Sequence, residues 1–162
     1  STRIFSLGGG GSHSLNGLAS SVPLDDSEFT SERVFDFTSP FPFRFKDYAG
    51  IVFTRLRDEL GVDDENYLAS ISGADGFLDF ISNSKSGSFF FYTYDKQYMV
   101  KSMSKAESKF MRSILKDYYN HMTQYRNSLL IKIFGLHRIQ MNGRDVYFLI
   151  MRNVFFASSS RP

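Results

Sequence analysis

The fold is decided by residues 83–115, which read NSKSGSFFFYTYDKQYMVKSMSKAESKFMRSIL. Small residues at positions 84–88 predict a flexible turn, and the aromatic run 89–93, which ends on a β-branched threonine, predicts a strand. Residues 94–97 predict a turn into a second strand over residues 98–103. A helix start follows, so this stretch predicts a strand hairpin that leads into a helix.

Lys101 is a lone charge on its face of the second predicted strand. Because side chains alternate along a strand, Lys101 shares its face with Met99 and Met103. One interpretation is a phosphate-binding lysine, since kinases cover and hold nucleotide phosphates with a flexible turn, a hairpin and an inward lysine. The other interpretation is an edge-strand lysine, whose stem packs while its ammonium reaches water. The residue pattern leaves both open.

The sequence SKAE at residues 104–107 is the S-x-x-E signature of a helix start. Glu107 has two candidate roles in this signature. It can pair with Lys101, as a strand lysine and a helix glutamate do in kinases, or it can bond to the backbone of its own helix start. Apolar residues at helical spacing predict that one face of the helix is buried, and they are Phe110, Met111, Ile114, Leu115, Tyr118 and Met122.

Two strands are predicted downstream of this helix. Residues 129–141 predict the first, in which Gly135 marks a bulge or a close backbone approach. Asn142 and Gly143 then predict a type I′ turn into a second strand over residues 145–156. That last run is almost continuously apolar, so it predicts a central strand buried on both faces. His137 lies in the first strand without a ligand pattern and is interpreted as a surface or core residue.

Upstream, residues 1–32 are polar and rich in serine and glycine, which predicts a flexible tail. Phenylalanines alternate over residues 35–45 around two prolines, which predicts an extended segment that packs within the chain or onto a second subunit. Apolar spacing and glycine stops predict helices over residues 45–60 and 63–73, and residues 77–81 are predicted to be extended.

Composition excludes several classes of site. The 162 residues include no cysteine, so a disulfide framework and a zinc–thiolate site are excluded. No group of His, Asp and Glu has metal-ligand spacing, and no apolar run is long enough to predict a membrane-spanning helix or a signal peptide. The net charge is only +2, but residues 96–116 carry six basic side chains and Glu107 as their single acid. This run predicts either a solvated helix face or a surface that contacts anionic lipid.

The order of helices, strands, helix and strands predicts an α+β domain, with an antiparallel sheet and helices on one side. Four segments in natural order resemble blocks of the phosphatidylinositol phosphate kinase family: SGSFFFYT, MVKSMSKAE, LLIKIFGLHRI and YFLIMRNVF. FRFKDYAGIVFTRLRDELGV and YLASISG resemble the start of that catalytic domain. The resemblance covers residues 43–156 and implies the amino-terminal lobe of a lipid kinase.

This resemblance implies ATP-dependent phosphorylation of a phosphoinositide headgroup. Two catalytic residues are implied, with Lys101 on the ATP phosphates and Glu107 orienting it. The residues implied to bind the nucleotide are Ser86, Gly87, Ser88, Lys101, Asn153 and Val154. The three residues of the turn would cover the phosphates with backbone N–H groups, and the last two would lie at the adenine-facing hinge. ATP would act with Mg²⁺, whose aspartate ligand in this family lies in a carboxy-terminal lobe downstream, so no metal ligand is expected here.

The predicted organisation is a flexible tail over residues 1–32, the kinase lobe over residues 33–156 and a truncated tail over residues 157–162. The resemblance further implies a cytoplasmic enzyme, peripheral at membranes, that acts on a phosphoinositide substrate and forms a possible homodimer. The alternative is a catalytically inactive truncated lobe that acts as a dimerisation or lipid-binding module. SKSGSFFFYTY also resembles the aromatic strand of an RNA-recognition motif, but the helices predicted before it argue against that fold, so no nucleic-acid partner is expected.

Overall fold

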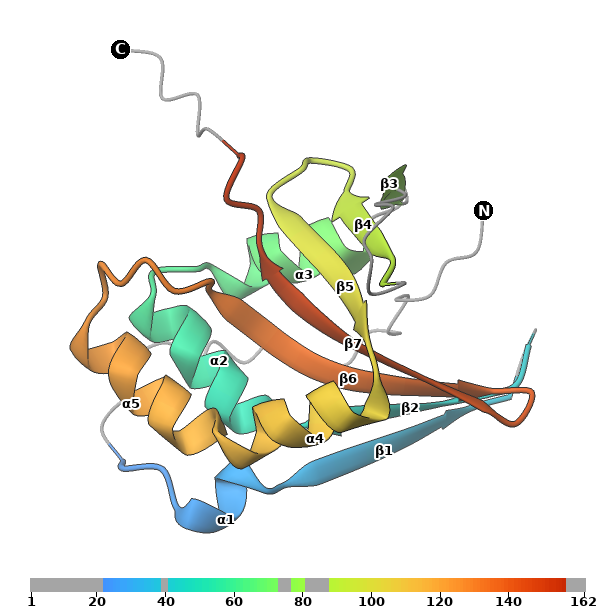
Figure 1. The fold of residues 1–162 in the computed structure, drawn as a ribbon, viewed down its shortest axis with the longest axis horizontal. Helices are drawn as coiled ribbons and strands as arrows, with labels where there is room; N and C mark the ends of the chain where they lie inside the picture. Colours follow the sequence, from blue (N-terminus) through green and yellow to red (C-terminus); the bar gives the residue numbers. More distant parts are fainter. Residues whose placement is uncertain (1–21, 39–40, 73–76, 81–87, 157–162) are drawn as a thin grey trace.

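The computed structural model describes residues 22–38, 41–72, 77–80 and 88–156 of the chain. Seven strands form one antiparallel sheet in the order β1-β2-β6-β7-β5-β4-β3 (Figure 1). The strands are β1 Glu32–Phe37, β2 Phe43–Tyr48, β3 Phe77–Phe80, β4 Phe90–Thr93, β5 Tyr98–Met103, β6 Ile133–Met141 and β7 Arg144–Arg152. The helices of the described part are α1 Asp26–Phe29, α2 Gly50–Glu59, α3 Asp64–Ser72, α4 Lys105–Ser113 and α5 Leu115–Gln124.

The predicted hairpin around the organising stretch is confirmed as β4 and β5. Their connection turns at Lys96, whose φ of 59° lies in the left-handed region. The carboxylate of Asp95 braces this turn, because it accepts the Thr93 hydroxyl at 2.6 Å and the Gln97 N–H at 3.1 Å. β5 pairs with β4 on one side and with β7 on the other, so it is an internal strand of the sheet.

The second predicted hairpin is confirmed as β6 and β7, but β7 ends at Arg152 and not at residue 156, and only its middle residues are buried. Asn142 and Gly143 have φ values of 51° and 73°, as a type I′ turn requires. The register of β6 against β7 shifts between Ile133 and Gly135, which confirms the predicted irregularity at this glycine. β6 begins at Ile133 and not at residue 129. The cause is Tyr118, whose hydroxyl donates to the Ile131 carbonyl and accepts the Ile133 N–H, so the preceding residues are held against α5.

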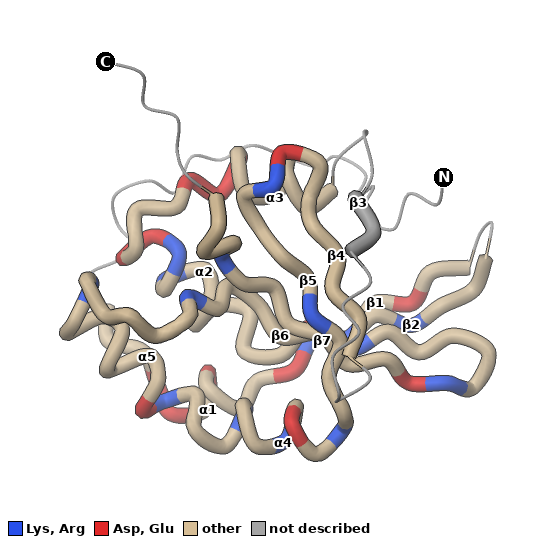
Figure 2. Tube along the Cα trace, turned by 45° about the horizontal axis from the view of Figure 1, so that its top comes forward, with Lys and Arg blue, Asp and Glu red and all other residues tan. Residues whose placement is uncertain are grey.

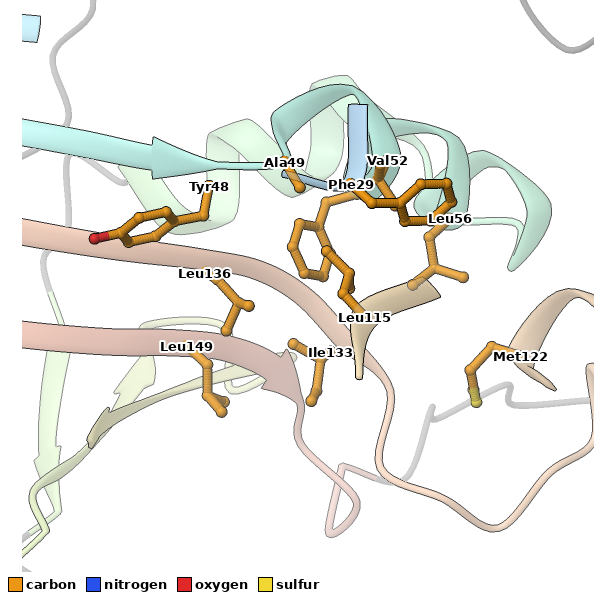
Figure 3. Packing of buried hydrophobic residues seen from close by; sticks show 11 residues of the cluster. Phe29, Tyr48, Ala49, Val52, Leu56, Leu115, Met122, Ile133, Leu136 and Leu149 are labelled. Carbon is orange, nitrogen blue, oxygen red and sulfur yellow. The ribbon is translucent and has the colours of Figure 1, made fainter. Parts of the chain in front are cut away.

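One face of the sheet carries the main hydrophobic core. Figure 3 shows this core where β2, β6 and β7 meet α1, α2 and α5. Val52, Leu56, Leu115, Met122 and Leu136 are completely buried in it. Burying one such side chain contributes about 1.5–3 kcal/mol, so these contacts stabilise the attachment of the helices to the sheet.

The other face is covered only in part, by α3. In Figure 1, α3 lies behind β5 and β7, whereas α4 and α5 lie in front of the sheet. Tyr67 and Ile71 of α3 pack with Tyr98, Phe134 and Ile150 from the sheet. The predicted α+β class is therefore confirmed, and α3 is the helix that departs from the predicted one-sided arrangement.

The segment before α2 differs from the sequence prediction. A helix was predicted over residues 45–60, but residues 43–48 form β2, and the helix begins only at Gly50. Strand pairing of β2 with β1 and β6 outweighs the helical spacing of its side chains. The alternating phenylalanines pack within the chain, since Phe37 stacks on Phe43 at 4.5 Å between ring centroids. Phe29 of α1, inside the predicted tail, is also buried in the main core.

The predicted helix after β5 is divided in two. α4 ends at Ser113, Ile114 takes up a non-helical conformation, and α5 begins at Leu115. The break rotates the two helical faces relative to each other. Leu115 and Met122 are buried as predicted, whereas Phe110 is 61% exposed and lies outside the core.

Candidate nucleotide-binding site

Lys101 lies on an internal strand, on the face of the sheet that α4 covers. Its register partner on β7 is Leu149, a member of the main core. Its ammonium Nζ is 3.8 Å from Oε1 of Glu107, and its side chain is 28% exposed. Because β5 is not an edge strand, the edge-lysine interpretation does not apply to Lys101. The structure instead shows a half-buried cation held next to a helix glutamate.

Glu107 fills both of its candidate roles at once. Its Oε2 accepts the Ser104 N–H at 2.7 Å, and the Ser104 hydroxyl accepts the Glu107 N–H at 3.2 Å, which completes the capping box. The other carboxylate oxygen faces Lys101. Hydrogen bonds from the Ser104 backbone and side chain lower the pKa of Glu107, and they outweigh the opposing effect of burial. The charge of Lys101 also lowers this pKa, by less than burial raises it. The start of α4 and the ion pair therefore depend on one carboxylate.

The structure describes only the last residue of the turn that is predicted to cover the phosphates, Ser88. Ser88 is buried, and it directly precedes the residues that pair with β5 beside Lys101. Ser86 and Gly87 lie outside the described residues. The structure thus brings Ser88, Lys101 and Glu107 into one region at the start of α4.

Asn153 and Val154 follow the end of β7. Asn153 is buried, its side-chain amide donates to the Lys96 carbonyl at 2.8 Å, and its Oδ1 accepts the Phe155 N–H at 3.0 Å. Its backbone N–H donates to the Gln97 carbonyl. The side chain therefore shapes the end of the strand and the β4–β5 turn, whereas Val154 is 65% exposed.

An apolar strip joins this end of β7 to Lys101. Met99 and Met151 are register partners on the same face as Lys101. Tyr98, which pairs with Arg152, lies three positions before Lys101 on β5, a span of about 10 Å. The strip offers apolar contact near the strand end and a positive charge at the other end. Sequence reasoning did not place Met151 in this strip, although its period-two spacing with Leu149 is a signal that could have done so.

Sequence reasoning also missed how α4 is held in place. Arg112 pairs with Glu32 of β1 at 3.1 Å and lies over the ring of Tyr48, 4.5 Å from its centroid. Lys116 of α5 pairs with Asp26 of α1 at 2.6 Å. No local spacing signals these contacts, because the partners are distant in the sequence. α1 and the start of β1 therefore anchor the helices that follow β5.

The predicted basic run is partly neutralised. Figure 2 shows Lys and Arg interspersed with Asp and Glu around α4 and α5. Lys101, Arg112 and Lys116 have acidic partners. Lys96, Lys105 and Lys109 make no ion pair within the part of the chain that the structure describes.

Other features of the described residues delimit the site. They contain no group of three His, Asp or Glu side chains that could hold a metal ion. No helix among them is both long and apolar enough to cross a bilayer.

A groove of about 270 Å³ lies on the opposite face of the sheet, lined by Phe35, Phe45, His137 and Ile71 among others. None of the predicted site residues lines this groove, so it is separate from the region around Lys101.

Comparison with known proteins gives a consistent result. The family model described as phosphatidylinositol-4-phosphate 5-kinase matches residues 71–161, more than half of the chain. Phosphatidylinositol 4-phosphate 5-kinase 5 of Arabidopsis thaliana is 44% identical over 121 residues, which cover 73% of this chain and 16% of the relative. A phosphatidylinositol 4-phosphate 5-kinase of Schizosaccharomyces pombe is 35% identical over 142 residues, which cover 82% of this chain and 19% of the relative. The chain therefore spans less than a fifth of the length of these curated relatives.

Proposed function

The chain belongs to the phosphatidylinositol-4-phosphate 5-kinase family, and we propose that it is the nucleotide-covering lobe of an ATP-dependent lipid kinase. The whole protein would transfer the γ-phosphate of ATP to an inositol hydroxyl of a phosphoinositide. Its relatives are named phosphatidylinositol 4-phosphate 5-kinases, so the proposed substrate is phosphatidylinositol 4-phosphate and the proposed acceptor is its 5-hydroxyl. The names of the relatives favour this function over an inactive dimerisation or lipid-binding lobe.

The single observation that supports this proposal most is the Lys101–Glu107 ion pair on an internal strand. A lysine in this position supplies a positive charge for the ATP phosphates, and a carboxylate next to it fixes where that charge lies. Ser88 would present its backbone N–H to the same phosphates. The apolar strip of Met99 and Met151 fits an adenine ring that reaches the strand end at Val154.

Mg²⁺ is the second cofactor that the proposed reaction requires. When it is bound, it neutralises charge on the transferring phosphate. Among the described residues no carboxylate cluster fits this ion. We therefore assign no metal ligand to the described residues, and we propose that the ligands belong to other parts of the kinase.

Partners and location follow from the same proposal. The phosphoinositide would be met at the cytoplasmic surface of a membrane, to which the kinase binds peripherally. Lys105 and Lys109 on the outside of α4 support contact with anionic lipid, because each basic residue near such a surface contributes about 1 kcal/mol. β1 lies at the edge of the sheet that the described residues form, and this supports a possible homodimer, since an edge strand can pair with a second copy.

The test is a lipid-kinase assay with radiolabelled ATP and mixed phosphoinositides, on the longest natural form of the protein. Lys101→Ala should lower kcat/KM for ATP by about a hundredfold or more, because the positive charge that would contact the transferring phosphate is lost. Arg144→Ala is the matched control, since it removes an exposed basic side chain at the start of β7 that makes no ion pair among the described residues. It should stay within about twofold of the parent in ATP turnover. Unchanged turnover in Lys101→Ala would refute the proposal.

A further inference from the structure

The β4–β5 ladder ends in an unusual pair. Beyond the last regular pair, Phe90 with Lys101, the Ser102 N–H donates to the Phe89 carbonyl at 2.9 Å. In a regular antiparallel pair the Phe89 N–H would donate to the Ser102 carbonyl in return. Here it donates to the Ser102 hydroxyl, Oγ, at 2.8 Å. A side chain therefore takes the place of a backbone acceptor, and the chain leaves the ladder at Phe89.

Ser102 and Lys101 are neighbours in sequence, but they lie on opposite faces of the sheet. Lys101 pairs with Leu149 on the face that carries α4, whereas Ser102 pairs with Phe148 on the face of Phe45. The Ser102 hydroxyl is therefore directed away from a phosphate held by Lys101. Any effect of this hydroxyl on the nucleotide must pass through the backbone of Ser88 and Phe89.

We propose that Ser102 is a positioning residue, whose hydroxyl fixes Ser88 relative to Lys101 and so sets the geometry of the phosphate site. This inference rests on the proposed kinase function. The anchored residue, Phe89, is next to Ser88, and its ladder neighbour Phe90 is opposite Lys101. A short backbone link thus connects the hydroxyl to the donor proposed to face the phosphates.

Removing the hydroxyl changes this link in a defined way. In Ser102→Ala the Phe89 N–H loses its acceptor, so it must turn to water or close onto the Ser102 carbonyl as in a regular ladder. Either change displaces Ser88, while the charge of Lys101 and its Glu107 partner stay in place. Ser102→Thr keeps a hydroxyl at the same position and a β-branched residue suited to a strand.

The experiment uses the intact kinase, with Ser102→Ala, Ser102→Thr and Ser113→Ala as the matched control. Ser113 also uses its hydroxyl in a hydrogen bond, to the Phe110 carbonyl, but it lies at the far end of α4. Two quantities are measured: the KM for ATP, and the hydrogen-exchange rate of the Phe89 amide. Ser102→Ala should raise both by about fivefold, the effect of one neutral hydrogen bond. The KM for the phosphoinositide, the Thr variant and the Ser113 control should each stay within about twofold of the parent.

Several results would overturn the inference while leaving the kinase proposal intact. One is faster exchange at Phe89 in Ser102→Ala with an unchanged KM for ATP, which is the mark of a purely structural bond. Another is a Thr variant that behaves like the Ala variant. If Ser102→Ala does not fold, Ser102→Cys replaces it, because sulfur is a weak acceptor, and the KM for ATP should shift in the same direction. Lys101→Ala distinguishes failure of the kinase proposal itself. Unchanged turnover in that variant would refute both the kinase proposal and the role proposed for Ser102.

Discussion

Glu107→Gln separates the two roles of one carboxylate. In the structure Oε2 accepts the Ser104 N–H at 2.7 Å, while Oε1 lies 3.8 Å from the Lys101 ammonium. Glutamine is as suitable as glutamate at this position of a capping box, because its amide oxygen accepts the same bond. The substitution therefore keeps the start of α4 and removes the charge that faces Lys101. Ser104→Ala is its counterpart, since it removes the cap and keeps the charge.

The structure gives the expected sizes of both effects. The side chains of Lys101 and Glu107 are 28% and 47% exposed, so their ion pair contributes at most about 1 kcal/mol to stability. Loss of the serine cap costs about 1 kcal/mol, which corresponds to roughly fivefold in the local opening of the helix. We therefore expect the α4 amides to exchange about fivefold faster in Ser104→Ala and less than about twofold faster in Glu107→Gln.

Activity should change in the opposite order. A misplaced Lys101 loses interaction with the transferring phosphate, so Glu107→Gln should lower kcat/KM for ATP by about tenfold or more, which corresponds to about 1.4 kcal/mol. Ser104→Ala should stay within about threefold, because the carboxylate can still face Lys101. Hydrogen exchange and radiolabelled ATP turnover on the intact kinase measure both quantities. Full turnover in Glu107→Gln would refute the reasoning and leave Glu107 as a helix cap alone.

Three further predictions concern stability. Gly135→Ala should lower the melting temperature by an amount equivalent to about 1–3 kcal/mol, because the added Cβ would lie 2.5 Å from Nε2 of His137, whose ring is confined between two phenylalanines; an unchanged melting temperature would contradict the packing argument. Leu115→Ala should cost about 2–5 kcal/mol in denaturant unfolding, since the side chain is fully buried, and Lys109→Ala on the exposed side of α4 is its control. Burial opposes ionisation of Asp95, but hydrogen bonds from Thr93 and neighbouring groups outweigh it and hold its pKa below 3.8, so its stabilising effect should be complete above about pH 5 and be lost as the pH falls through that lowered pKa. Thermal melts across this pH range should show a smaller pH dependence of the melting temperature in Asp95→Asn than in the parent. The same pH dependence in both proteins would rule out Asp95 as a source of the acid sensitivity.

The features that sequence predicted correctly depend on local chemistry. The capping box at Ser104 and the turn at Asn142 and Gly143 use neighbouring residues, and their signals remain valid whatever the rest of the chain does. Alternation along β5 was enough to place Lys101 between two methionines on one face. The pairing of Lys101 with Glu107 was one of two roles that the sequence left open for Glu107, and it came from the strand lysine and helix glutamate of kinases.

The features that sequence missed depend on distant partners. Tyr48 has the spacing of a helix residue relative to Val52, but it belongs to β2, because β2 pairs with a strand about 90 residues later. Phe29 looked like part of a tail, and only the core on α2 and α5 explains its burial. The hydroxyl of Ser102 acts on Phe89 through a strand register that no spacing rule encodes.

The hydrogen bonds of Asn153 predict at which residue the chain can bend beyond the end of β7. Its backbone N–H and its side-chain amide tie the end of β7 to two consecutive carbonyls of the β4–β5 turn, at Gln97 and Lys96. A torsional change at Asn153 would break this tie, whereas a change from Val154 onward would leave it whole. The sheet, Lys101 and α4 should therefore move together as one rigid unit, with the hinge just beyond Asn153. If the proposed kinase opens and closes around a nucleotide, Lys101 and Glu107 would then move together, and the distance between them would not change.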